Sequence, residues 1–184
     1  SGIMVHPSSH QLNIYTLLDE IKYHLGEKAS LVHRIDTETS GLVLVAKNAF
    51  SDMFLKNMFE EKLYKKSYKA IVEGEIKEKL EINKPITNDD GLIKLKMKTD
   101  VKGKESITLI NPIFYDETKN QTLIEAIPLT GRQHQIRVHL DSIGHKIIGD
   151  TLYGVDEEFA NMFLNNQISK EDRIQTTKAS RLML

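Results

Sequence analysis

The sequence predicts an α+β domain, because stretches of strand character are gathered between and after a small number of helices. Apolar residues recur at helical spacing in four stretches, and runs of strand length occupy much of the chain between residues 42 and 127. The regular β-α alternation that would indicate a doubly wound parallel sheet is not present. With 184 residues, the chain is long enough for one sizeable hydrophobic core and short for two domains.

Four helices are expected from apolar periodicity and from capping residues. Residues 13–25 carry apolar side chains on one side, and Gly26 supplies a stop. Asn48 can cap a helix over residues 49–62. We expect the aromatic and methionine stripe of that helix to lie in the core: Phe50, Met53, Phe54, Met58 and Phe59. Two shorter helices are expected over residues 133–143 and 156–164.

Strands are expected wherever apolar residues run continuously or alternate. The continuous run at 42–46 contains β-branched residues and is typical of a buried strand. Further strands are predicted over 68–72, 93–97, 107–110 and 122–127. Alternation is clearest over residues 92–98, which predicts a half-exposed edge or hairpin, and residues 88–91 mark the turn before it.

The charge of the chain is balanced overall and uneven locally. There are 25 Lys+Arg against 26 Asp+Glu, a formal charge of −1, whereas an RNA-binding protein usually has a basic balance. Two basic clusters stand out nevertheless: Lys62, Lys65, Lys66 and Lys69, then Lys94, Lys96, Lys98, Lys102 and Lys104. Such clusters suffice for phosphate contacts, although for the second cluster a merely solvated strand face explains the pattern equally well.

The cysteine count and the hydropathy of the chain limit the cellular compartments and the kinds of site that are expected. The chain has no cysteine, which excludes disulfides and thiolate metal sites and fits a reducing compartment. No apolar stretch approaches the length of a membrane span, and no signal peptide opens the chain. We therefore expect a cytoplasmic, monomeric protein with no membrane partner.

The most informative segment is a charged, hydroxyl-rich stretch, residues 33–41, placed directly before the apolar run at 42–46. Asp36 is its candidate catalytic residue, with Arg34 two positions earlier and hydroxyl side chains following it. This setting suits a carboxylate that is kept ionised. An Asp before Thr and Ser is also ordinary turn and helix-cap chemistry, so the local pattern alone leaves both readings open.

The segment HRIDTETSGLVLVAK, residues 33–47, resembles the central signature of RluA-type pseudouridine synthases. Residues 2–7 resemble the end of the family's first motif, and residues 66–70 with Val72 and Gly74 resemble its tyrosine motif. Residues 130–140, TGRQHQIRVHL, resemble the arginine-bearing segment, and the expected pieces at 144–145, 149–150 and 152–154 follow it. Because four motifs occur in the right order, the resemblance covers nearly the whole chain.

The resemblance implies the pseudouridine synthase fold, a long curved and mostly antiparallel sheet flanked by helices, with an active cleft across its middle. It implies isomerisation of uridine to pseudouridine in ribosomal RNA or tRNA. That reaction needs no cofactor and no metal, but it needs a well-placed carboxylate and a closed pocket. We read residues 1–184 as the catalytic domain, cut short at both ends and without the S4-type RNA-binding domain that many family members carry.

The resemblance also assigns roles to individual residues. Asp36 matches the catalytic aspartate, Arg137 the arginine that pairs with it, and Tyr68 the tyrosine that stacks on the flipped base. From the residues alone, Arg137 could instead pair with Asp141 four positions later, and Tyr68 could simply be a packing residue. The family match favours the active-site roles.

Further residues are implied to contact the RNA or the uracil. Arg34 matches the arginine that enters the helical stack or contacts a phosphate, and Ile136 would form an apolar wall beside the base. The remaining candidate contacts are His33, Thr39, Arg132 and His134.

Two other functions compete with this interpretation. A hydrolase metal site could use His33, Asp36, His134 and His139, but His134 and His139 are five residues apart and fall on different helical faces. A non-catalytic RNA-binding module is the second alternative. It has no use for a buried carboxylate, which would repel phosphate.

Overall fold

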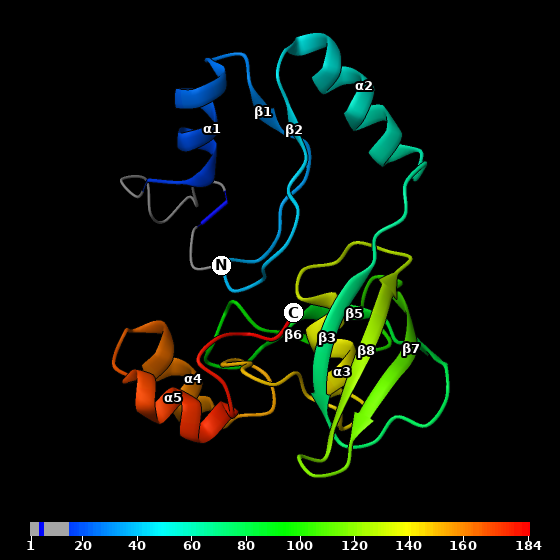
Figure 1. The fold of residues 1–184 in the computed structure, drawn as a ribbon, viewed down its shortest axis with the longest axis vertical. Helices are drawn as coiled ribbons and strands as arrows, with labels where there is room; N and C mark the ends of the chain where they lie inside the picture. The colour runs from blue at the N-terminus through cyan, green and yellow to red at the C-terminus, as the bar shows by residue number, and fades with distance from the viewer. Residues whose placement is uncertain (1–3, 6–14) are drawn as a thin grey trace. The chain divides into compact units, whose positions relative to one another are not determined.

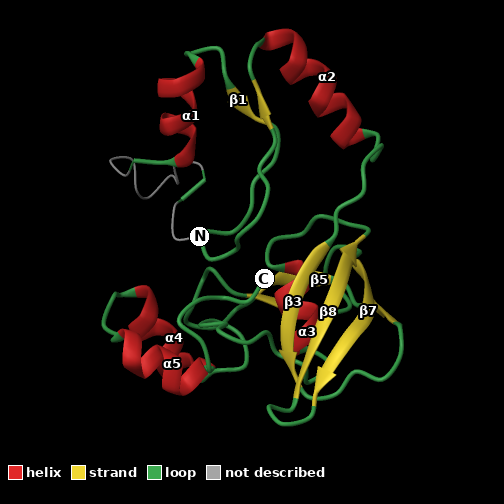
Figure 2. Cartoon of the chain, viewed as in Figure 1, coloured by secondary structure: helices red, strands yellow, loops and turns green. Residues whose placement is uncertain are grey.

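The computed structural model describes residues 4–5 and 15–184, which divide into two compact units, Ser1–Lys65 and Lys66–Leu184. Figure 1 traces their elements along the chain, and Figure 2 distinguishes helices, strands and loops. Among the described residues, no helix has the length and apolar character needed to cross a membrane.

The first unit consists of two helices and a short two-stranded ladder. Helix α1, Leu17–Leu25, begins at a capping box in which the side chains of Thr16 and Asp19 each accept the other's backbone N–H. It ends at Gly26, which adopts a φ of 89°. Strands β1, Ser30–Leu31, and β2, Val45–Ala46, are antiparallel, and helix α2 spans Ala49–Glu60. Positions 13 and 14 of the predicted first helix lie outside the described residues.

Two expectations for this unit are wrong. The run at 42–46 forms a ladder only at its last two residues, and the Leu42 side chain is 95% exposed. Helix α2 begins at Asn48 as predicted, but it buries none of its residues, and Phe50, Met53 and Phe54 are exposed. The apolar periodicity identified a helix correctly. The apolar side chains on one face of a helix are buried, however, only when another element packs over that face. The two-residue strand β2, against which α2 packs, is too small to do so.

The second unit is built on an antiparallel sheet with strand order β3-β8-β7-β4. These strands are β3, Tyr68–Glu73; β8, Gln121–Pro128; β7, Ile107–Asp116; and β4, Leu80–Asn83. A separate hairpin pairs β5, Ile86–Asn88, with β6, Met97–Thr99. The expected α+β class and the strands at 68–72, 107–110 and 122–127 are confirmed. The strand predicted over 93–97 is wrong, because residues 93–96 form a turn closed by the Lys96 N–H and the Ile93 carbonyl.

Helix α3, Gln135–Asp141, is buried over six consecutive residues because it packs between two apolar clusters. Ile136 and Leu140 belong to the cluster under the four-stranded sheet, whereas Val138 belongs to the cluster beneath the β5–β6 hairpin. In Figure 1, α3 lies against the sheet formed by β3, β8 and β7. This burial on several sides lets α3 hold polar side chains in fixed directions.

Helices α4, Glu157–Leu164, and α5, Lys170–Thr177, form a pair in which the Arg173 guanidinium lies 5.1 Å from the ring centre of Phe163. The sequence predicted a helix over residues 156–164, which α4 confirms, but it did not predict α5, whose only apolar side chain is Ile174. Polar contacts position α5 instead. The Gly149 N–H donates to the Thr177 carbonyl, and Arg173 donates to the Gly149 carbonyl.

Gly149 makes the closest backbone approach in this region, to the Arg181 carbonyl group. It has a φ of +81°, and an added Cβ would lie 1.8 Å from the Arg181 carbonyl oxygen. We expect Gly149→Ala to lower the free energy of unfolding by about 2–3 kcal/mol, measured by urea denaturation. Gly131→Ala is the matched control, because that site is open space without a positive φ, and it should change stability by less than about 0.5 kcal/mol. Equal stability of the two variants would contradict this account.

Candidate active site

Asp36 lies at the start of a tight turn in the first unit. The Asp36 carbonyl accepts the Thr39 N–H at 2.9 Å, and the Thr39 side chain is buried. Asp36 is half-buried and Arg34 is exposed. The turn therefore fixes the backbone of Asp36 through an interaction that does not involve its carboxylate.

His33 orders the two limbs of the loop that carries this turn. Its Nε2 accepts the Leu44 N–H at 3.0 Å, and its ring stacks on Phe59 with a centroid distance of 5.4 Å. An Nε2 that accepts requires a neutral ring with the proton on Nδ1. In the structure, His33 thus has a positioning role. Its expected contact with RNA stays a prediction.

Tyr68 is the first residue of β3, where it pairs with Ala126 of β8. Its half-buried side chain packs against the cluster beneath the four-stranded sheet. This packing limits the directions that the ring can take at the start of the strand. Stacking on a base stays a prediction.

The segment that leads into α3 is organised by Gln135, which sequence reasoning did not single out. Its Oε1 accepts from the Thr130 hydroxyl and from the Arg132 N–H, and its Nε2 donates to the Ile107 carbonyl and the Thr108 hydroxyl. The next residue back, His134, has a left-handed backbone with φ 54° and ψ 18°. A left-handed conformation is uncommon for a residue with a side chain, and it must be held by the surrounding contacts.

His139, on α3, is fully buried inside the second unit. Its Nδ1 contacts the Thr108 hydroxyl and its Nε2 contacts the Lys84 carbonyl, both at 2.9 Å. Burial is the main reason why the pKa of His139 is lowered from its usual value, so the ring is held neutral. Both ring nitrogens are thus occupied. Within the described part of the chain, no three His, Asp or Glu residues are grouped so that they could hold a metal ion.

Arg137 forms a buried ion pair with Asp150, thirteen residues later in the chain. Its Nε donates to Oδ2 at 2.8 Å and its Nη2 donates to Oδ1 at 2.7 Å, while the two side chains are 3% and 1% exposed. The alternative pairing with Asp141 is therefore wrong, because the guanidinium turns toward the 149–154 loop and away from the end of its own helix. Burial, with the nearby Asp150 charge, raises the pKa of Asp141 above its usual value.

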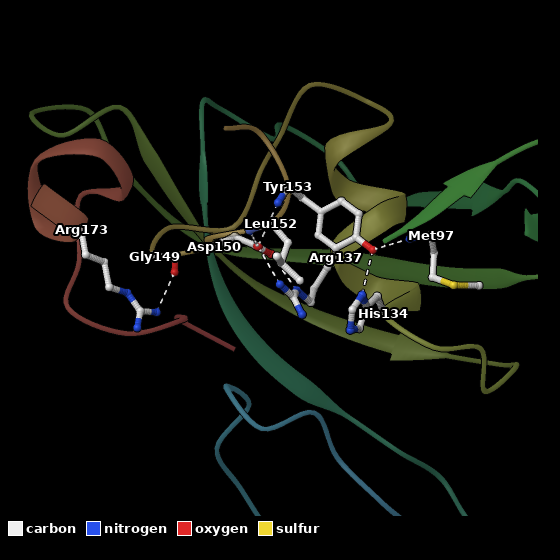
Figure 3. A network of polar contacts seen from close by, with 8 residues as sticks. All are labelled: Met97, His134, Arg137, Gly149, Asp150, Leu152, Tyr153 and Arg173. Carbon is white, nitrogen blue, oxygen red and sulfur yellow. Dashed lines mark hydrogen bonds and ion pairs between the residues drawn. The ribbon is translucent and has the colours of Figure 1, made fainter. Parts of the chain in front are cut away.

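Tyr153 completes the surroundings of Arg137, as Figure 3 shows. The Arg137 Cζ lies 5.0 Å from the centre of the Tyr153 ring. The Tyr153 hydroxyl accepts the Met97 N–H at 2.9 Å and contacts His134 Nδ1 at 2.8 Å. The hydroxyl can therefore accept from Met97 and still donate its single proton to His134 Nδ1. These polar contacts join Arg137, Asp150, Tyr153 and His134 into one network.

The other two candidates on this segment differ in exposure. Arg132 is exposed and donates from Nε to the Glu105 carbonyl. Ile136 is 7% exposed and belongs to the core under the sheet, so its role as a wall beside uracil stays a prediction.

Within the second unit, the structure brings Arg137 and His134 together with Asp150 and Tyr153. His33, Arg34, Asp36 and Thr39 share one loop of the first unit, so the pairing of Asp36 with Arg137 stays a prediction. The sequence reasoning gave Asp150 and Tyr153 no chemical role. The sequence contained one signal for Asp150. An Asp side chain can accept hydrogen bonds from the N–H groups two and three residues later, and Asp150 does so from Leu152 and Tyr153.

Comparisons with known proteins agree with these motifs. Residues 1–142 match the family described as RNA pseudouridylate synthase. An uncharacterized RNA pseudouridine synthase of Helicobacter pylori strain J99 is 41% identical over 95% of this chain and 59% of its own length. Ribosomal large subunit pseudouridine synthase C of Rickettsia bellii is 42% identical over 72% of this chain and 44% of its own length. This chain thus spans about half the length of these curated relatives.

A solved structure has the same fold. Human RNA Pseudouridylate Synthase Domain Containing 1 superposes with a TM-score of 0.68 at 26% sequence identity. The match covers 78% of this chain and 62% of the human chain. The α+β arrangement is therefore that of a pseudouridylate synthase domain.

Proposed function

This chain belongs to the RluA-type family of RNA pseudouridine synthases, and from that premise we propose that the protein isomerises specific uridines of ribosomal RNA or tRNA to pseudouridine. The family match over residues 1–142 is the observation that carries the proposal. The name of the Rickettsia relative supports ribosomal RNA as the first substrate to test. We include in the proposal a cytoplasmic location and action as a monomer.

The reaction breaks the N1–C1′ bond of uridine, turns the uracil over and joins C5 to C1′. The C5 proton is released to solvent and N1 takes up a proton, so that the product is an isomer of the substrate. In this proposal Asp36 supplies the carboxylate, which either attacks C1′ or removes the C2′ proton. Arg137 favours the ionised form of that carboxylate and sets its direction. A guanidinium that Asp150 holds by its Nε and Nη2 edge suits this task, because the bidentate pair fixes its plane and direction.

The target nucleotide must leave the RNA stack, because C1′ and C5 are shielded from side chains inside a helix. Tyr68 is the proposed stacking surface for the flipped base, and Arg34, exposed on the Asp36 loop, is proposed to enter the vacated position or to contact the phosphate. His33, Thr39, Arg132 and His134 are retained as residues that line or order this site.

A tritium-release assay tests the proposed activity. The purified protein is incubated with ribosomal RNA and tRNA transcripts that carry [5-³H]uridine, and released tritium is measured beside sequencing that maps pseudouridine. We expect release that matches the number of mapped sites and that is unaffected by EDTA. Tight RNA binding without release would favour the non-catalytic RNA-binding module, and loss of activity with EDTA would favour a metal site.

Substitution of Tyr68 separates its ring from its hydroxyl. Tyr68→Phe keeps the flat surface, whereas Tyr68→Ala removes it, and base–aromatic stacking contributes about 1–3 kcal/mol. We therefore expect Tyr68→Ala to lower kcat/KM by roughly 5- to 150-fold more than Tyr68→Phe does. Tyr115→Ala on β7 is the matched control, a half-buried tyrosine outside the matched motifs, and it should change stability alone. Equal kcat/KM for the two Tyr68 variants would contradict a stacking role.

A further inference from the structure

Four hydrogen bonds converge on the carboxylate of Asp150. Oδ1 accepts from Arg137 Nη2, from the Leu152 N–H and from the Tyr153 N–H, and Oδ2 accepts from Arg137 Nε. The carboxylate is attached to the chain just after Gly149, whose backbone is itself enclosed by Arg181 and Thr177. Asp150 therefore has one accessible orientation, and it imposes that orientation on the guanidinium of Arg137.

Tyr153 constrains the same guanidinium from a second direction. Its ring lies beside Arg137 while its hydroxyl is held by Met97 and His134, as the dashed contacts in Figure 3 show. A two-point hydrogen-bonded edge combined with an aromatic neighbour defines both the plane and the direction of an arginine side chain.

Tyr153 also connects this arrangement to the lysine-bearing hairpin. Met97 is the first residue of β6, and Lys96 Nζ lies 5.8 Å from the Tyr153 ring centre. A second tie joins the segment before α3 to the same hairpin, because Gln133 Nε2 donates to the Leu95 carbonyl. The backbone that carries Lys94, Lys96 and Lys98 is thus anchored to the residues around Arg137.

We propose that Asp150 and Tyr153 are positioning residues for the isomerisation: they fix the direction of Arg137 toward the catalytic carboxylate and tie it to the β5–β6 hairpin. This inference rests on the proposed function, in which Arg137 acts at the reacting site. It assigns no contact with substrate to either residue. Their effect passes through Arg137 and is therefore seen in kcat more than in KM.

Asp150→Asn is the decisive variant because it keeps the shape of the side chain. Oδ1 accepts three donors and Oδ2 accepts one, so the new amide NH₂ is placed at the Oδ2 position, where it faces the Arg137 Nε–H. Two donors repel each other, and the guanidinium has to move. A misplacement of about 1 Å can cost about 100-fold in rate, so we expect kcat to fall by about 100-fold with KM nearly unchanged.

The pH profile distinguishes positioning from a merely structural role. A displaced guanidinium stabilises the ionised catalytic carboxylate less, so the acid limb of the kcat profile should move to higher pH in Asp150→Asn. Tyr153→Phe keeps the ring beside Arg137 and loses the hydroxyl contacts, so we expect a smaller fall in kcat, about 10-fold, with a shift of the same sign. Asp141→Asn, a half-buried aspartate at the end of α3, is the control and should behave like wild type.

All rates are measured per folded molecule, with the folded fraction taken from thermal melting. A wild-type kcat for Asp150→Asn, or a lowered kcat with an unmoved acid limb, would overturn the inference. If Asp150→Asn does not fold, Tyr153→Phe decides in the same way. Arg137→Lys separates the two proposals: wild-type turnover by this variant would remove the catalytic role of Arg137 and the inference with it. An inactive Arg137→Lys beside a wild-type-like Asp150→Asn would remove the inference alone.

Discussion

Arg137→Met is expected to abolish turnover and also to destabilise the second unit strongly. From the sequence alone, the variant should stay folded, because the apolar face of α3 at Ile136 and Leu140 is unchanged. The structure alters that expectation: the substitution leaves the Asp150 carboxylate, 1% exposed, without its two guanidinium donors. Removal of one partner from a buried ion pair costs about 3–5 kcal/mol.

The double variant Arg137→Met/Asp150→Leu is the control for this effect. It replaces both buried charges by apolar side chains, and such exchanges are often near neutral for stability. Part of the loss should remain, because the N–H groups of Leu152 and Tyr153 lose their acceptor. A buried neutral donor without a partner nevertheless costs less than a buried charge without one. We therefore expect urea denaturation to show the double variant as more stable than Arg137→Met, while both are inactive. A single variant as stable as wild type would show that Asp150 reaches water or another cation.

The sequence predicted the parts of the fold whose signal is local. Apolar runs of strand length located β3, β7 and β8, Asn48 correctly marked the start of α2, and apolar periodicity located α4. Helix α5 was missed because tertiary polar contacts, such as Gly149 with Thr177, hold a segment that has almost no apolar face. The apolar side chains of α2 were wrongly predicted to lie in the core, because periodicity identifies an apolar face of a helix without identifying the element that covers it.

The candidate site shows the same division between local and long-range information. The motifs identified Asp36, Tyr68 and Arg137 as residues, but the partner of Arg137 depended on how the 149–154 loop folds back onto α3. At helical spacing, the sequence indicated Asp141 as a possible partner. The structure pairs Arg137 with Asp150, whose buried carboxylate also accepts hydrogen bonds from two backbone N–H groups. Long-range polar pairs of this kind follow from the packed structure and not from spacing.

Asp36→Asn is expected to lower turnover by about 10⁴-fold or more, as happens when a reacting group is removed from an enzyme whose residues act as a unit. The substitution keeps the shape of the side chain and removes only its charge. Folding should be unaffected, because the turn depends on the Asp36 carbonyl and the Thr39 N–H, which the variant keeps. RNA binding should persist or tighten, since one negative charge near the phosphates is lost.

Tritium release under multiple-turnover conditions measures this effect, and RNA affinity is determined on the same preparation by filter binding. Glu38→Gln is the matched control, because it neutralises the neighbouring carboxylate in the same turn, and it should stay within a few-fold of wild-type turnover. Asp36→Ala should be as inactive as Asp36→Asn, and it cannot regain a carboxylate by deamidation. Sustained turnover by Asp36→Ala with intact RNA binding would require a different carboxylate. Glu38 would then be the first residue to test, because it is the other carboxylate of the same turn and directly precedes the buried Thr39.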